Sequence, residues 1–154
     1  MEDLTRDYSE QEIIHFAKAA KRDEASFKWL MENDCKELAA LCDVLVYGNT
    51  EAFDWLKKNR LMTLLAFVNA LNDDEEAFRF LLKGTHKVWA AVVNSINGDE
   101  KAKKWLLRFD MKHFLLLVDS LSLSLRRTRR GGGFAGGGVG RFGGLGGGGT
   151  GVRW

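Results

Sequence analysis

The strongest constraint on the fold is a pattern of residues that recurs at an interval of 25. The regular copies occupy residues 48–72, 73–97 and 98–122. A less regular copy precedes them and aligns when one residue is inserted. Units of this length cannot bury their apolar side alone, so they stack on one another. The pattern therefore predicts an all-α fold in which short helical hairpins stack as a small α-solenoid.

Each copy is expected to begin with a helix that follows a polar cap. The caps are Asp23, Asn49, Asp74 and Asp99. Side chains of this kind accept the free amide hydrogens of a first helical turn. The second helix of each copy is apolar over more of its circumference, which is typical of helices between layers. Ser9 and Glu12 form a capping box that predicts one more helix of this second kind at the start of the chain.

The expected order is thus nine short helices up to about residue 125. Residues 120–125 alternate between Ser and Leu, so they could form an extended segment. Leu117, Leu121 and Leu125 also keep helical spacing, and we favour a continuation of the last helix.

The aromatic residues have two interpretations. Trp29, Trp55, Trp89 and Trp105 could form a platform for nucleobases, or they could belong to the core. We favour the core because the aromatic position of the first helix, which Phe80 occupies in one copy, keeps a fixed phase. His86 and His113 precede second helices and are expected at the surface.

One polar position interrupts the apolar second helices. It is occupied by Asp43, Asn69, Asn94 and Asp119. These side chains could form a polar ladder along a groove that binds a peptide backbone. Alternatively, each could brace the neighbouring loop. We favour the second interpretation because a buried polar group without a hydrogen bond costs about 1–3 kcal/mol.

The composition changes at residue 126, which divides the chain into a helical repeat domain (1–125) and a basic glycine-rich tail (126–154). The tail holds six of the 23 basic residues and none of the 21 acidic ones, so the body carries about −4 and the tail +6. Such a polarity favours self-association or capture of an anionic polymer. The candidate partner-binding residues of the tail are Arg126, Arg127, Arg129, Arg130, Phe134, Arg141, Phe142, Arg153 and Trp154.

Catalysis finds little support in the sequence. The three histidines are unevenly spaced, and there is no phosphate-binding loop between a strand and a helix. Cys35 and Cys42 are the only cysteines, and we interpret them as buried thiols rather than as a disulfide or a ligand pair. We therefore expect no enzymatic activity, no cofactor and no metal site.

Two parts of the tail resemble known sequences. Residues 130–134 and 140–144 resemble the RGG boxes of RNA-binding proteins, which implies that Arg contacts phosphate and stacks on bases while Phe adds stacking. The stretch that ends at residues 149–154 also resembles the glycine-rich ends of some bacterial envelope proteins with a TPM-type domain. That resemblance implies an envelope-associated adaptor.

Our hypothesis is a non-enzymatic interaction or assembly protein, a scaffold or adaptor. Its partner would be another protein or a second copy of the chain. The first alternative is binding of RNA, single-stranded nucleic acid or another polyanion through the tail. No window reaches the roughly 18 apolar residues of a membrane span, and the first residues do not resemble a secretory signal, so we expect a cytoplasmic protein.

Overall fold

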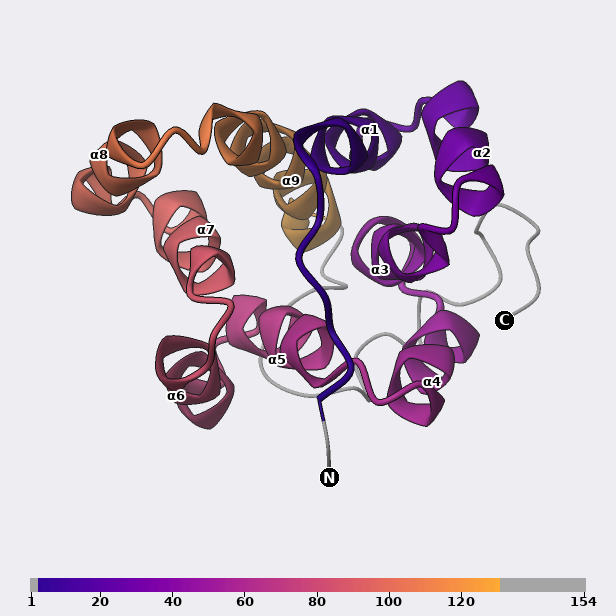
Figure 1. Cartoon of the computed structure of the whole chain (residues 1–154), viewed down its shortest axis with the longest axis horizontal. Coiled ribbons are helices and arrows are strands. Elements are labelled where there is room, and N and C mark those ends of the chain that lie inside the picture. The colour runs from indigo at the N-terminus through magenta and orange to yellow at the C-terminus, as the bar shows by residue number, and fades with distance from the viewer. Residues whose placement is uncertain (1–2, 131–154) are drawn as a thin grey trace.

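The computed structural model describes residues 3–130, and over this range it is all-helical, with no strand (Figure 1). The helices are α1 (Glu10–Ala20), α2 (Glu24–Glu32), α3 (Lys36–Tyr47), α4 (Thr50–Lys58), α5 (Met62–Leu71), α6 (Glu75–Lys83), α7 (Val88–Ile96), α8 (Glu100–Arg108) and α9 (Lys112–Arg130). The all-α prediction is confirmed for these residues, and the number and order of the helices match the expectation.

Local chemistry defines where α1, α2, α4, α6 and α8 begin. The expected capping box forms at α1, where Ser9 accepts the N–H of Glu12 and the Glu12 carboxylate accepts the N–H of Ser9. The four expected caps each accept a backbone N–H of the following first turn; they are Asp23, Asn49, Asp74 and Asp99. The residue before each of these caps has a positive φ, and glycine fills this position before α4 and α8.

Five helices form a ring in the order α1, α3, α5, α7 and α9 (Figure 1). The ring closes because α9 packs along α1, where the Ser124 hydroxyl donates a 2.6 Å hydrogen bond to the Ala20 carbonyl. The remaining helices, α2, α4, α6 and α8, lie outside the ring, and each packs on the ring helix that precedes it. We refer to the two sets as the ring helices and the outer helices.

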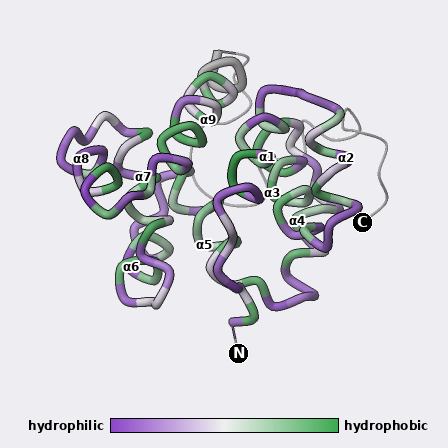
Figure 2. Tube along the Cα trace, turned by 45° about the horizontal axis from the view of Figure 1, so that its top comes forward, coloured by the Kyte–Doolittle hydropathy of each residue, from purple (hydrophilic) through white to green (hydrophobic). Residues whose placement is uncertain are grey.

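The core lies inside the ring. Trp89 of α7 is only 1% exposed, and its ring meets those of Phe67 in α5 and Phe114 in α9 at centroid distances of 4.9 and 5.6 Å. Edge-to-face packing of this kind is favourable for aromatic pairs. Figure 2 shows that α5 is mostly hydrophobic, whereas hydrophilic and hydrophobic stretches alternate along α6 and α8.

Residues 3–9 form a strap that runs from α1 across one face of the ring to the start of α5 (Figure 1). The N–H of Leu4 donates to the carbonyl of Arg60 at 2.8 Å. Asp7 lies 2.9 Å from His86, so the strap covers this histidine, whose side chain is only 13% exposed. The expectation of a surface position is therefore wrong for His86, and His113 is also only half-exposed.

The core interpretation of the tryptophans holds for Trp89 but not for all of them. Trp29 and Trp55 are half-buried and pack against the core, whereas Trp105 is 36% exposed. Phe80, at the same position of α6, is 44% exposed. The outer helices turn their leucines inward instead, and these are almost fully buried: Leu30, Leu56, Leu81 and Leu106. An aromatic residue one position earlier is rotated by about 100° from this leucine, so it lies at the edge of the contact.

Two further expectations concern Cys35, Cys42 and the end of the body. Both thiols are free and buried, which confirms the interpretation made from the sequence. Residues 120–125 are helical, as favoured, and α9 continues to Arg130. Arg126, Arg127, Arg129 and Arg130 therefore belong to its last turns. The other candidate residues of the tail lie outside the described residues; they are Phe134, Arg141, Phe142, Arg153 and Trp154.

Candidate functional site

Two depressions on the outer side of the molecule share one design. The first, of about 430 Å³, lies where α4, α5 and α6 meet. The second, of about 330 Å³, lies where α6, α7 and α8 meet. Every residue that lines the second depression lies 25 positions after a residue that lines the first. The sequence interval thus reappears as a repeated surface.

Residues that lie 25 positions apart in the sequence occupy equivalent places in the two depressions. Small residues, Ala66 and Ala91, lie on the ring helices. Exposed aromatic residues, Phe80 and Trp105, lie on the outer helices. Alanine leaves space between the helices, and an aromatic side chain offers a large apolar surface at its edge.

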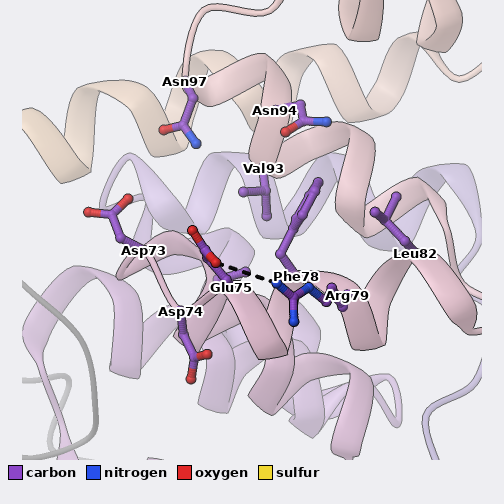
Figure 3. A pocket seen from close by; sticks show the side chains of 10 residues that line it. Asp73, Asp74, Glu75, Phe78, Arg79, Leu82, Val93, Asn94 and Asn97 are labelled. Atoms are coloured by element: carbon purple, nitrogen blue, oxygen red, sulfur yellow. Dashed lines mark ion pairs between the residues drawn. The ribbon is translucent and has the colours of Figure 1, made fainter.

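A third depression, of about 520 Å³, lies between α6 and α7 (Figure 3). It shares Asp74 with the first and Leu82 and Asn94 with the second. Phe78 lies near Val93 between the helices, and Asp73 and Asp74 lie at one end (Figure 3). We call the three together the outer groove.

The outer groove is acidic near the start of α6. Asp73, Asp74 and Glu75 line the third depression, and Arg79 is the basic residue beside them. Arg79 is engaged in an ion pair with Glu75 at 3.5 Å (Figure 3). Both partners are well exposed, so this pair contributes little to stability, and the carboxylates of Asp73 and Asp74 dominate the local charge.

The corresponding places on the preceding helices are filled by the chain itself. His15 of α1 stacks on Trp29 of α2, with a centroid distance of 4.0 Å and an interplanar angle of 13°. Burial, followed by the charge of Lys18, lowers the pKa of His15, which favours the neutral ring. The Lys36 ammonium lies 5.4 Å from the centroid of the Trp55 ring. Aromatic residues at this position are therefore covered in α2 and α4 but more exposed in α6 and α8, although the Trp105 ring also contacts Phe109 at a centroid distance of 5.0 Å.

The exposed large hydrophobic residues show the same asymmetry. In the described part of the chain they are Leu4, Phe80, Leu82, Trp105, Leu107, Phe109, Leu116 and Leu123. Apart from Leu4 in the strap, all of them fall in α6, α8 or α9 or directly after α8. Exposed apolar residues gathered in one region indicate an interaction surface, whereas scattered ones do not.

The predicted polar ladder is divided by the structure. Asp43 is fully buried, Asn69 and Asn94 are half-buried and line the outer groove, and Asp119 is exposed. Their backbone carbonyls brace the loops, since Asp43, Asn69 and Asn94 accept the N–H of the next cap at 2.9–3.1 Å. The Oδ1 atom of Asn69 is buried without a hydrogen-bond partner.

Sequence reasoning missed Leu82 and Leu107, although a signal was present. In α6 and α8 an aromatic residue is followed two positions later by a leucine, as in Phe80 with Leu82 and Trp105 with Leu107. Residues two apart on a helix do not share a side, so one member of each pair has to leave the core contact. At the matching position, α4 carries Lys57 instead.

No three His, Cys, Asp or Glu side chains among the described residues gather as a metal site. None of the helices that the structure describes combines the length and hydrophobicity needed to span a bilayer. Comparison with protein-family models gives no match, and comparisons with curated proteins and with solved structures give none either.

Proposed function

We propose that the protein is a non-enzymatic interaction module whose helical pairs are units of a small α-solenoid. The outer groove of this module binds a segment of a partner protein. The observation that carries the proposal is the pair of depressions related by 25 residues, each with an exposed aromatic residue at its edge. A repeated surface suits a partner that extends across neighbouring units, as is common for repeat proteins.

Lys57, Lys87 and Lys101 line the two smaller depressions, so the acidic character of the outer groove is confined to the start of α6. These acidic residues and the apolar residues of the groove suggest the chemistry of the partner segment. Asp73 and Asp74 favour a segment with a basic residue, and Phe80 and Trp105 favour apolar or planar side chains. Arginine meets both requirements, because its guanidinium pairs with carboxylates and stacks on aromatic rings. The tail would contribute a second contact by self-association or docking through Arg141, Phe142 and Trp154.

The experiment is a quantitative affinity capture with the full chain and a Phe80→Ser/Trp105→Ser variant. Both substituted side chains are exposed, so the variant should keep its helical content. We expect the variant to lose the proteins that the wild type captures. Nuclease treatment should not remove these proteins from the wild type. A matched control is Asp54→Ser/Lys58→Ser, which changes exposed residues of α4 outside the groove.

Light scattering of the full chain, with and without nuclease, tests the alternative. Binding of RNA or another polyanion through about four to six arginines should weaken steeply as salt rises. If all captured material disappears with nuclease or at moderate salt, and Phe80→Ser/Trp105→Ser has no effect, the groove proposal is wrong.

A further inference from the structure

The outer face of α9 and the adjoining side of α8 carry exposed leucines that the outer groove does not include. Leu116 and Leu123 of α9 are 49% and 48% exposed, and Leu107 of α8 is 51% exposed. The opposite side of α9 is buried in the core; it carries Phe114, Leu117, Val118, Leu121 and Leu125. We call Leu107, Leu116 and Leu123 the terminal face.

On the other ring helices, the corresponding face is covered. The helix that follows each of them, namely α2, α4, α6 or α8, packs against it. Leu116 lies 25 residues after Ala91 and 50 after Ala66, and both of these alanines lie in depressions bordered by the following outer helix. Leu107 likewise lies 25 residues after Leu82. Within residues 3–130, no helix follows α9 to cover its face.

The chain itself shows what kind of element covers such a face. Each outer helix has nine residues, and its first turn contains at least one glutamate. Each begins a few residues after the preceding ring helix ends, so its acidic first turn lies beside the carboxyl-terminal end of that helix. Helices are packed this way because an amphipathic helix buries its apolar stripe on a neighbour.

Charge specifies the occupant further. Residues 99–130 contain nine basic and four acidic residues, a net charge of +5, whereas residues 3–98 contain 12 basic and 16 acidic residues, a net charge of −4. The last turns of α9 include four arginines. The helix α7 ends at Ile96, which corresponds to Leu121 of α9, so α9 continues beyond the point where α7 ends. Asp119 of α9 is exposed between Leu116 and Leu123, but the four arginines outnumber it, so an acidic first turn would meet a basic helix end. The net positive charge of this region disfavours the pairing of two copies through it.

We propose that the terminal face binds an amphipathic α-helix of a partner protein, and that the acidic first turn of this helix lies beside the basic end of α9. Leu116 stands where α5 and α7 carry alanine, so the bound helix lies farther from α9 and meets Leu116 with a small residue. The terminal face is distinct from the outer groove, so the proposal for one surface can be wrong while the proposal for the other holds.

The probe is a fluorescein-labelled peptide of residues 73–84, which copies α6 and carries four acidic and two basic residues. Anisotropy with the full-length protein should show saturable binding below about 1 mM, an upper limit set by the cost of ordering a short helix. The matched control peptide carries Phe78→Ser and Leu81→Ser and should not bind. Backbone amide shifts of the labelled protein should change in α8 and α9.

The protein variant is Leu116→Ser/Leu123→Ser, which alters exposed side chains and should preserve the circular dichroism spectrum. We expect a loss of peptide affinity of at least about tenfold, since two apolar contacts are removed. The groove variant Phe80→Ser/Trp105→Ser should bind the peptide like the wild type. Because amide shifts locate the site on the wild type, the test remains decisive even if the leucine variant unfolds.

Three outcomes would overturn the proposal. The first is absence of peptide binding at 1 mM, or shifts confined to helices other than α8 and α9. The second is a wild-type dimer in light scattering that Leu116→Ser/Leu123→Ser dissociates, which would make a second copy the occupant. The third is sedimentation with phosphatidylserine-containing vesicles that depends on these leucines, while the peptide does not bind; a lipid surface would then be the occupant.

Discussion

The hydroxyl of Thr63 donates a 2.6 Å hydrogen bond to the carboxylate of Asp3, which lies 60 residues earlier in the chain. The same carboxylate accepts the N–H of Met62 at 3.0 Å. Leu61, which directly precedes α5, provides no side-chain cap. Asp3 therefore caps α5 although it is distant in the sequence, whereas Asn49 directly precedes α4, the helix that it caps.

Asp3→Ala should lower the free energy of unfolding by about 1–2 kcal/mol at pH 7, because α5 loses its cap. Burial raises the pKa of Asp3, but the hydrogen bonds from Thr63 and Thr5 outweigh it and leave the pKa below its usual value of 3.8. A lowered pKa means that this stabilisation is complete above pH 3.8 and is lost as the pH falls through the folded value. Urea denaturation should thus show wild type and variant converging in strong acid. Asp54→Ala, on the exposed side of α4, is the control, and an equal effect of both substitutions would refute the cap.

Arg6→Gln should weaken the attachment of the strap to α1. The Arg6 guanidinium lies 2.7 Å from the Glu12 carboxylate, and this hydrogen bond lowers the pKa of Glu12 to about 2. We expect a loss of about 1 kcal/mol at pH 7, since Arg6 is partly exposed and the pair is screened by water. The loss should persist above the usual pKa of glutamate and vanish as the pH falls through about 2. Titration followed by NMR checks this, and a Glu12 pKa that stays near 2 in the variant would contradict it.

Truncation of the two tryptophans Trp89 and Trp105 should separate the core from the groove. Trp89→Ala removes a ring that is 1% exposed and should cost about 3–5 kcal/mol through the cavity left behind. Trp105→Ala, at 36% exposure, should cost less than about 1 kcal/mol. Thermal unfolding by calorimetry measures both. Similar losses for the two variants would place Trp105 in the core after all.

The native thiols should react only when the protein opens. Burial raises the pKa of Cys35 to about 12 and also raises that of Cys42, so both remain protonated at pH 8. The thiolate is the reactive form, and access is blocked as well. Reaction with Ellman's reagent should be fast in urea. In the absence of urea, the rate of reaction should equal the rate at which the protein unfolds. Rapid reaction of either thiol in the native protein would show that the helix around it opens locally.

Features with short-range causes were predictable from the sequence. The caps Asp23 and Asp99 act on amides two residues away, and the leucines of α9 keep one helical spacing to Leu125. The strap has no such signal, because Asp3 finds its partners about 60 residues away. The exposure of Trp105 was not predicted. The 25-residue interval shows that Trp105 is equivalent to Trp55, but it does not show which side of the helix these residues occupy.

The candidate groove was predictable only in part. Asn69 and Asn94 could be placed in one polar ladder from their spacing, but not assigned to an open surface. That surface depends on what fills the equivalent place in each unit: His15 stacks on Trp29, whereas Ala66 leaves space beside Phe80. Such differences arise from pairs of side chains on separate helices, and a single sequence does not reveal which pairs meet.

The contact between α1 and α9 also limits how this molecule can change its length. In a repeat protein whose first and last units do not touch, duplication of one unit adds a layer and leaves the contacts between the other units unchanged. Here an extra pair of helices inserted between α1 and α9 would disturb the contact between them, including the hydrogen bond from Ser124 to Ala20. To close again, the ring would need altered angles between neighbouring helices. Gene duplication therefore meets a barrier in this fold that open arrays do not have, and change through substitution at the surface remains the easier course.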